Sequence, residues 1–313
     1  MNGSQQAIDL CARLLVDPGE IVAVENPGYR MAHHVFETVG ATLRGVDVDQ
    51  QGLQTDELEK LPHARLVFVT PTHQFPLGSF LAVSRRHALL QWAATRNAWV
   101  VEDDYDSEYR FGVRPEATLL SLDDRALVIH VGTFSKTLSP RLRLGYMVLP
   151  SRLATTFAAA KRLADRHAPV AAQRALAALL ESGAYERHVR RLRRAQQVRQ
   201  SALLDSLQRH LTDRVTVQGA ASGLLVVAWI DDLPQAAEAA VVAAARREQV
   251  QVYPLTPFYV TEREGRRKTR RAGLVLGYAL LTPEQIDEGV RRLSRALRCV
   301  SRSTVVPAPA ALR

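Results

Sequence analysis

Residues 131–146 read Val131-Gly-Thr-Phe-Ser-Lys-Thr-Leu-Ser-Pro-Arg-Leu-Arg-Leu-Gly-Tyr146, directly after a short apolar run that is typical of a buried strand. The stretch presents Lys136 among hydroxyl side chains and arginines. A lysine at a strand exit can form an imine with an aldehyde, while Thr133, Ser135 and Arg143 can hold a phosphate beside it. Pyridoxal phosphate carries both groups. The motif therefore suggests this cofactor, and a solvated turn is the alternative.

A second stretch, Trp99-Val-Val-Glu-Asp-Asp-Tyr-Asp106, predicts a buried strand that becomes acidic at its end. Ligands of parallel sheets lie beyond the carboxyl ends of the strands. Because side chains alternate along a strand, Asp103 and Tyr105 share one face and Asp104 faces the other way. An aspartate can keep the pyridine nitrogen protonated, and a tyrosine can hydrogen-bond the phenolic oxygen of the ring. The alternatives are a helix-capping cluster or, less well supported without a histidine nearby, a metal-binding patch.

A third stretch lies at the start of the chain, where Gly3-Ser-Gln-Gln precedes an amphipathic helical pattern up to Leu15. The free N–H groups and the positive end of the helix dipole would bind an anion there. Ser4 is then either a phosphate ligand or simply the residue that caps the helix.

Together these residues resemble fold-type I pyridoxal-phosphate enzymes, and most closely the aminotransferase-like domain of MocR/GabR-type transcriptional regulators (aminotransferase class I/II). The resemblance rests on six motifs in the order of that family: Gly3-Ser-Gln-Gln, Glu25-Asn-Pro-Gly-Tyr29, Thr70-Pro-Thr-His-Gln-Phe-Pro-Leu-Gly78, Val101-Glu-Asp-Asp-Tyr-Asp-Ser-Glu-Tyr-Arg110, Thr133-Phe-Ser-Lys-Thr-Leu-Ser-Pro-Arg-Leu-Arg-Leu-Gly145 and Leu276-Gly-Tyr278.

The resemblance implies a role for each matching residue. Lys136 would carry the internal aldimine, Asp103 would contact the ring nitrogen and Tyr105 the ring oxygen. Tyr29 would stack on the cofactor, although it could equally be a packed loop tyrosine. Arg271 would bind the carboxylate of an amino acid through two parallel hydrogen bonds, and Arg270 is the nearest alternative for this role. The phosphate ligands would be Ser4, Gln5, Thr133, Ser135 and Arg143.

The chain departs from ordinary aminotransferases at Phe75-Pro-Leu-Gly78. Those enzymes carry Asn-Pro-Thr-Gly at this place, and the asparagine bonds the ring oxygen. An aromatic residue here is usual in the regulator branch and favours a sensor ancestry. His73 is a candidate substitute for the missing amide, but a loop histidine without an acidic partner in the sequence is more often structural.

Another departure is at the amino terminus. The regulators begin with a winged helix-turn-helix and a first part of the large domain, and here only two residues precede Gly3. We therefore expect that residues 1–313 do not include the DNA-binding domain. Two functions stay open: a domain that senses an amino compound or amino acid by forming aldimines, or a catalytically active aminotransferase of amino acids. A cofactor-free oligomerisation module is a third, and the resemblance implies a homodimer.

The composition is that of a globular protein, with 47% hydrophobic and 23% charged residues among 313. There is no apolar run long enough for a membrane span and no signal-peptide pattern. Cys11 and Cys299 are isolated thiols, which fits the cytoplasm. The net charge of +9 comes partly from a predicted helix between Ala171 and Leu211 and from the Arg263–Arg271 segment. No DNA-binding motif accompanies these charges, so a solvated basic face is the simpler interpretation.

The order of elements predicts an α/β protein, with a mostly parallel sheet covered by helices and a smaller α+β unit after it. The predicted divisions are a cofactor-binding large domain (1–168), an interdomain helix (169–210), a small domain (211–299) and a disordered tail (300–313). Strands are predicted at Ile21–Glu25, Thr42–Val48, Leu66–Thr70, Trp99–Glu102, Leu127–Val131, Leu144–Leu149, Val215–Val217, Gly223–Trp229, Val250–Tyr253 and Gly273–Gly277, and further helices at Gln235–Glu248 and Thr282–Leu297.

Overall fold

The computed structural model describes residues 1–111, 116–260 and 270–304. The chain divides into two units, which are described separately below. The first takes in residues 1–194 with the short segments 221–223 and 258–264, and the second takes in the rest.

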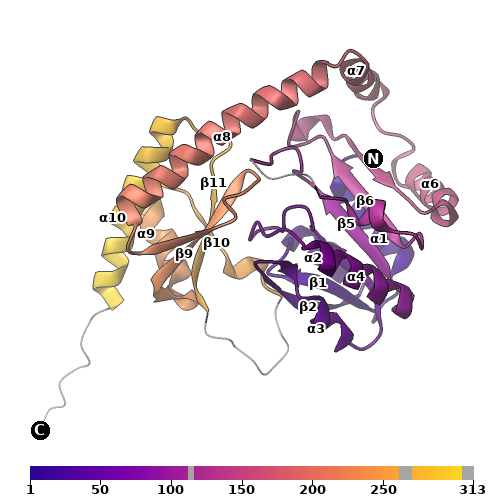
Figure 1. Ribbon diagram of the computed structural model, residues 1–313, viewed down its shortest axis with the longest axis horizontal. Helices are drawn as coiled ribbons and strands as arrows, with labels where there is room; N and C mark the ends of the chain where they lie inside the picture. Colours follow the sequence, from indigo (N-terminus) through magenta and orange to yellow (C-terminus); the bar gives the residue numbers. More distant parts are fainter. Residues whose placement is uncertain (112–115, 261–269, 305–313) are drawn as a thin grey trace, which may run out of the picture. The chain divides into compact units, whose positions relative to one another are not determined.

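A seven-stranded sheet forms the centre of the first unit, in the order β3-β2-β1-β4-β5-β6-β7. Figure 1 labels β1, β2, β5 and β6 of this sheet. Its five central strands are parallel, whereas β3 and β7 pair antiparallel at the two edges. This confirms the predicted mostly parallel sheet. The strands are β1 (Ile21–Asn26), β2 (Thr42–Asp49), β3 (Gly52–Leu53), β4 (Ala64–Val69), β5 (Trp99–Asp104), β6 (Val128–Thr133) and β7 (Gly145–Val148).

Two apolar layers cover this sheet, one on each face. Alternate residues of a strand enter opposite layers: Val22 and Val24 pack in the layer of α1 and α2, while Ala23 packs in the layer of α3 and α4. The central strands β1 and β4 are therefore mostly apolar, because both of their faces are buried. The helices of the first unit are α1 (Ser4–Leu15), α2 (Arg30–Thr38), α3 (Thr55–Glu59), α4 (Val83–Arg96), α5 (Leu119–Leu122), α6 (Ser151–Asp165) and α7 (Val170–Glu181), with the short 3₁₀ helix η1 (Pro140–Leu142).

The strand order reverses at β1, which has β2 on one side and β4 on the other. In open α/β sheets such a reversal opens a crevice at the carboxyl ends of the strands. The segments that follow β1, β4, β5 and β6 all leave the sheet at this edge. They carry Tyr29, His73, Tyr105 and Lys136, so motifs that are far apart in the sequence follow neighbouring strands at one edge of the sheet.

The predicted single helix between Ala171 and Leu211 is wrong. The structure has two helices instead, α7 (Val170–Glu181) and α8 (Ala184–Leu211). The chain breaks at Ser182 and Gly183, and Gly183 has a φ of 65°. This left-handed backbone conformation favours glycine and commonly ends a helix.

The second unit contains a four-stranded antiparallel sheet in the order β10-β11-β9-β8. Thr282 caps α10 through its hydroxyl, which accepts a bond from the Gln285 N–H at 3.3 Å, and Pro283 is the first helical residue. The helix continues to Thr304, so the predicted tail start at residue 300 is wrong, and residues 305–313 lie outside the described residues. The elements are β8 (Val215–Gln218), β9 (Leu225–Pro234), η2 (Gln235–Ala237), α9 (Glu238–Arg247), β10 (Tyr253–Pro254), β11 (Arg271–Gly277) and α10 (Pro283–Thr304); η3 (Thr256–Phe258) lies where the chain passes back to the first unit.

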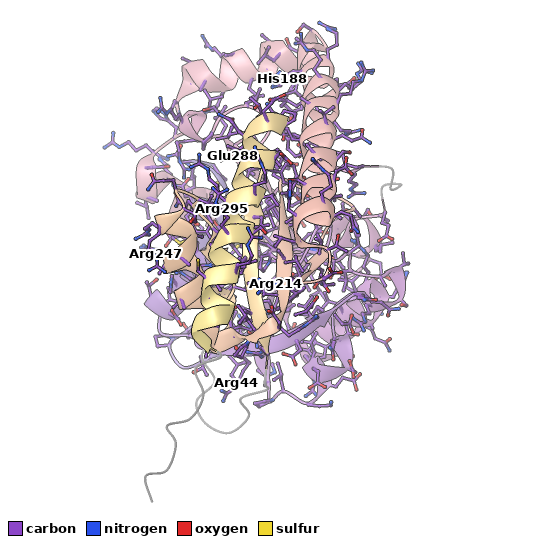
Figure 2. The ribbon with its side chains drawn as sticks, turned by 90° about the vertical axis from the view of Figure 1, so that its left-hand side faces the viewer. Arg44, His188, Arg214, Arg247, Glu288 and Arg295 are labelled. Atoms are coloured by element: carbon purple, nitrogen blue, oxygen red, sulfur yellow. The ribbon has the colours of Figure 1, made fainter. Side chains whose placement is uncertain are left out.

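Many of the basic side chains in the second unit are paired with acidic ones. Glu288 and Arg295 both lie on α10 (Figure 2). Arg295 contacts Glu248 at 2.9 Å, and Glu288 contacts Arg292 at 2.7 Å. Arg214 contacts Asp232 at 2.7 Å. These acidic partners partly neutralise the positive charge of the arginines. Of the helices that the structure describes, none is long and apolar enough to cross a membrane.

Candidate functional site

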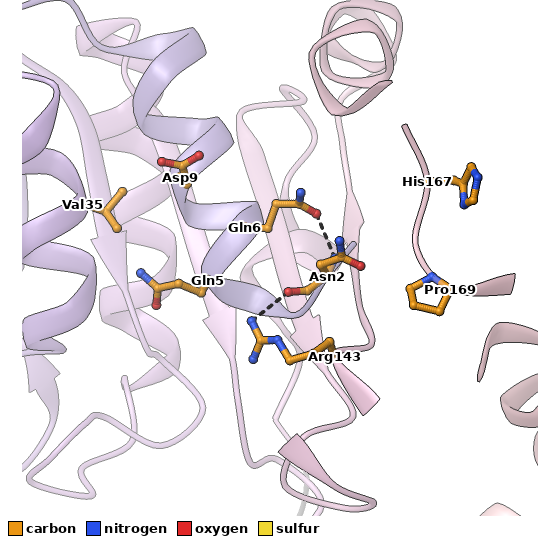
Figure 3. A pocket seen from close by; sticks show the side chains of 8 residues that line it. All are labelled: Asn2, Gln5, Gln6, Asp9, Val35, Arg143, His167 and Pro169. Carbon is orange, nitrogen blue, oxygen red and sulfur yellow. Dashed lines mark hydrogen bonds between the residues drawn. The ribbon is translucent and has the colours of Figure 1, made fainter. Parts of the chain in front are cut away.

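The amino terminus of α1 lies against the turn that carries Arg143. Gly3 occupies the N-cap position without a side-chain bond, so the alternative that Ser4 caps this helix is wrong. Arg143 donates a hydrogen bond to the Asn2 carbonyl at 2.9 Å (Figure 3). A Cβ atom on Gly3 would stand only 3.1 Å from the Arg143 guanidinium. The free N–H groups of the first helical turn and a guanidinium therefore lie side by side, which is an arrangement that binds anions.

Strand β7 fixes this arrangement from the other side. The Met1 amine donates to the Gly145 carbonyl at 2.9 Å, and the Gly145 N–H donates to the Met1 carbonyl at 3.2 Å. A pocket of about 760 Å³ opens beside it (Figure 3). Gln5 and Arg143 are both among its lining residues, which are Asn2, Gln5, Gln6, Asp9, Val35, Arg143, His167 and Pro169.

Two hydroxyl groups at the end of β6 face each other. The Thr133 hydroxyl lies 3.0 Å from the Ser135 hydroxyl and accepts a bond from the Ser135 N–H at 3.2 Å. Both belong to the turn that leads to Lys136, whose carbonyl accepts a 2.6 Å bond from the Tyr109 hydroxyl. The backbone of the lysine is thereby held, while its side chain is exposed.

Asp103 is buried at the end of β5, and its Oδ1 atom has no hydrogen-bond partner among the described residues. Burial, with a smaller effect from the neighbouring Asp104, raises the pKa of this carboxyl to about 7, although the charges of His130 and Lys136 act in the opposite direction. An uncompensated buried carboxylate is costly, so this atom is suited to a cationic or N–H partner from a ligand.

The pKa of the Tyr29 hydroxyl depends on the charges of both Asp103 and Arg143. Burial raises the pKa of its hydroxyl, the charge of Asp103 raises it further, and the charge of Arg143 lowers it. The ring packs edge-on against Phe75 at 5.6 Å between centroids. Phe75 also contacts Tyr105 at 5.9 Å and Phe258 at 5.4 Å. Phe75 is thus the centre of an aromatic cluster.

Sequence reasoning missed a buried glutamate in this region. Glu25 ends β1, and its carboxylate accepts bonds from the Thr70 hydroxyl at 2.6 Å and from the Gln74 amide at 3.3 Å. Burial raises its pKa to about 7, against the effect of these hydrogen bonds. The sequence carried a signal, since Glu25 and Thr70 each end a predicted strand, and the structure shows that these two strands pair in parallel.

Glu102 has a structural role that matches one of the alternatives for the acidic cluster. It accepts bonds from the Leu119 and Leu120 N–H groups at 2.8 and 3.1 Å, at the beginning of α5. It also contacts His130 Nδ1 at 2.9 Å. Glu102 therefore joins β5, β6 and α5 and helps to fix the strand that carries Asp103.

The two arginines proposed for a carboxylate belong to the second unit. Arg271 is the first residue of β11, forms an ion pair with Asp231 and lies over the Trp229 ring at 5.8 Å. The carbonyl of Arg270 accepts a bond from Gln235 N–H at 2.8 Å. Residues 263–269 of the same basic segment lie outside the described residues.

Comparison with known proteins gives consistent matches along the chain. Residues 1–293 match the family model for aminotransferase class I and II. The chain is 37% identical over 308 residues to the probable rhizopine catabolism regulatory protein MocR of Rhizobium meliloti, covering 98% of this chain and 60% of the regulator. It is 35% identical to the 2-aminoadipate transaminase of Thermus thermophilus, covering 95% of this chain and 74% of the enzyme.

Solved structures give the same result. The crystal structure of LysN, an α-aminoadipate aminotransferase from Thermus thermophilus in complex with N-(5'-phosphopyridoxyl)-L-leucine, superposes with a TM-score of 0.87 at 32% identity. The match covers 96% of this chain and 77% of that one. The chain spans about three fifths of the length of the regulators that it matches.

Proposed function

We propose, from the premise that this chain belongs to the aminotransferase class I and II family, that it binds pyridoxal phosphate and senses an amino compound as part of a MocR-type transcriptional regulator. The observation that carries the proposal is Asp103. A buried carboxylate oxygen without a partner among the described residues fits the protonated pyridine nitrogen of this cofactor.

The remaining residues of the first unit fit the other parts of the cofactor. The first turn of α1, with Ser4 and Gln5, would hold the phosphate together with Thr133, Ser135 and Arg143, through N–H groups, hydroxyls and a guanidinium. Tyr29 would lie on the ring, and Tyr105 would donate a hydrogen bond to the ring oxygen. These assignments follow the residues' order around the crevice at the carboxyl ends of the strands.

Bound pyridoxal phosphate supplies an aldehyde that reacts with amines and a ring that accepts electrons. Lys136 would hold the cofactor covalently and release it to an incoming amine. Asp103 would keep a proton at the ring nitrogen. The burial of Asp103 near the end of β5 would shield that proton from water, which strengthens the interaction.

Sensing is favoured over turnover by Phe75. The aromatic ring stands where ordinary aminotransferases carry the amide that bonds the ring oxygen, and it packs among aromatic side chains. The second candidate, a catalytically active aminotransferase, is favoured by the similarity to the Thermus thermophilus transaminase. In either case, residues 1–313 would bind the amino compound. In a regulator, other parts of the protein would contact DNA.

The two candidates differ in what happens after an amino acid binds. Purified protein is reconstituted with pyridoxal phosphate and titrated with amino acids, and oxo-acid formation is followed together with the visible spectrum. For a sensor we expect a saturable, reversible spectral change with no more than one equivalent of oxo acid. Continued oxo-acid production would establish the transaminase, and a protein that acquires no visible band would refute both.

Arg271 remains the proposed ligand of an effector carboxylate. Arg271→Lys keeps the charge but loses the planar fork, so an amino acid should need on the order of tenfold more ligand for the same spectral change. A simple amine without a carboxylate should titrate as before. Arg270→Lys is the matched control. If only the Arg270 variant weakens amino-acid binding, the assignment moves by one residue, and if neither does, the carboxylate binds elsewhere.

We extend the proposal to a homodimer. Helix α7 has no buried residue in the described structure, although it is rich in alanine and leucine, and Leu179 and Leu180 are exposed on it. Leu163 at the end of α6 is 89% exposed. Apolar surface of this kind is typical of interfaces. Sedimentation should give a mass twice that of the chain, and Leu163→Glu with Leu180→Glu should yield monomers. A wild-type monomer would contradict this.

A further inference from the structure

A buried histidine lies beside the tyrosine that is proposed to contact the cofactor. His73 follows β4, and both its ring and Asp106 are about 1% exposed. His73 Nδ1 lies 2.9 Å from Asp106 Oδ2, 3.2 Å from Asp106 Oδ1 and 2.9 Å from the Tyr105 hydroxyl. One nitrogen atom thus meets both a carboxylate and a phenol, and the three side chains form a connected group.

The carboxylate decides where the proton of the imidazole lies. An ionised aspartate can only accept hydrogen bonds, so the Nδ1 atom that faces Asp106 must carry a hydrogen. A nitrogen that carries a hydrogen has no lone pair left to accept the Tyr105 proton. The Tyr105 oxygen can therefore only share the Nδ1–H group as an acceptor. Its own O–H proton is then free to point away from His73.

That O–H group keeps its proton at neutral pH. Burial raises the pKa of Tyr105 well above its ordinary value, and four neighbouring carboxyl groups add to the effect, those of Asp106, Asp103, Glu25 and Asp104. Tyr105 is therefore a hydrogen-bond donor, and His73 and Asp106 set the direction of its O–H group.

The position of the histidine ring is also fixed. The backbone of Gly223 lies against it so closely that a Cβ atom would stand 2.0 Å from His73 Cε1. Gly223 has a φ of 84°, which favours glycine independently of the contact. On another side, Phe80 packs against the ring at 6.3 Å between centroids. The Nε2 atom is buried and has no partner among the described residues, so Nδ1 makes all the hydrogen bonds that this ring forms there.

We propose that His73 and Asp106 are positioning residues that turn the Tyr105 hydroxyl towards the ring oxygen of the cofactor, in the absence of an amide at Phe75. The inference rests on the proposed function, because it needs the cofactor to lie beside Tyr105. It adds the acidic partner that makes His73 more than a structural loop histidine. Asp106 acts only through His73, and His73 only through Tyr105.

Asp106→Asn is the decisive variant. A neutral amide no longer holds the imidazole proton at Nδ1, so the histidine can carry its proton on Nε2 and leave the Nδ1 lone pair to accept the Tyr105 proton. The ring oxygen then loses its donor. Since this donor competes with the proton on the lysine-linked nitrogen of bound pyridoxal phosphate, its loss lets that nitrogen hold its proton to higher pH. We expect the pH midpoint of the visible band to rise by about one unit, as in Tyr105→Phe.

A double-variant cycle separates this role from a purely structural one. If Asp106 acts through Tyr105, adding Asp106→Asn to Tyr105→Phe should leave the midpoint where Tyr105→Phe alone puts it. His73→Asn places an amide N–H near the position of Nδ1 and should keep the wild-type midpoint, whereas His73→Leu should raise it. Phe80→Leu is the packing control, since it loosens the ring contact without removing a hydrogen bond, and its midpoint should stay unchanged.

A second readout does not need the cofactor. In the apoprotein, the His73 Nδ1 proton should give a resolved downfield NMR resonance that Asp106→Asn abolishes, because only the carboxylate holds the proton there. Absence of this resonance in wild type overturns the inference, as does an unchanged midpoint in Asp106→Asn when the wild-type band is normal. A wild-type protein with the NMR resonance but no visible band overturns the proposed function, and the inference with it.

Discussion

Lys136→Ala should abolish the visible absorbance band that the wild-type protein acquires with pyridoxal phosphate. The band requires a covalent imine, and Lys136 directly follows Ser135 in the turn whose Thr133 and Ser135 hydroxyls contact each other. The Lys136 carbonyl bond from the Tyr109 hydroxyl fixes the backbone, so loss of the side chain should leave the turn in place. Absorbance spectra of wild type and variant, each mixed with the cofactor and dialysed, give the measurement.

The chain makes this test sharp because it has only four lysines, at positions 60, 136, 161 and 268. Lys60 and Lys161 pair with acidic neighbours, Glu57 and Asp165, which makes them poorer nucleophiles. Borohydride reduction followed by peptide mapping should place the label on Lys136. Lys60→Ala is the matched control and should retain the band. A label on any other lysine would refute the assignment.

The ends of the strands could be predicted because they depend on local sequence. Apolar runs bounded by polar residues gave β1, β5 and β6 to within two residues, and the residues that follow them include Tyr29, Tyr105 and Lys136. Parallel strands bring such ends to one edge of a sheet, so the composition of the site follows from the order of elements. The roles of those residues remain proposals.

The contact of His73 with Asp106, next to Tyr105, could not be predicted in the same way. His73 and Asp106 are 33 residues apart, and no acidic residue stands near His73 in the sequence. Their contact exists because β4 and β5 are neighbours in the sheet, which places the loops after them side by side. A search for polar residues after adjacent parallel strands would have suggested the pair, but not which nitrogen atom meets the carboxylate.

The prediction of one helix between Ala171 and Leu211 was wrong for a different reason. The segment from Ala171 to Leu211 has strong helix formers throughout, and a single glycine in such a segment costs only about 1 kcal/mol. Propensity alone therefore allows a continuous helix. The break at Gly183 is visible only in its left-handed backbone, which the amino-acid pattern permits but does not require.

Asp103→Asn should slow any half-reaction with an amino acid far more than it weakens cofactor binding. The carboxylate keeps the ring nitrogen protonated, and a neutral amide leaves the ring a poorer electron acceptor, which we expect to raise the barrier by roughly several kcal/mol. Asp104→Asn is the matched control and should have little effect. Single-turnover kinetics and cofactor titration give both quantities. Equal losses in the two variants would contradict the assignment of Asp103 and Asp104 to opposite faces of β5.

The same substitution should have the opposite effect on the apoprotein. The pKa of Asp103 is raised to about 7 by burial, so the folded state binds this proton more tightly than the unfolded state does. The free energy of unfolding therefore falls as the pH rises from about 4 to about 7, and the loss persists above that range. The amide that replaces the carboxyl has no proton to lose, so the variant should gain stability relative to wild type over this window, by up to a few kcal/mol. Urea denaturation of both apoproteins at about pH 5 and about pH 8 measures the difference. If the relative stability does not change with pH, Asp103 has a partner in solution, and the carboxylate oxygen is not held open for the cofactor.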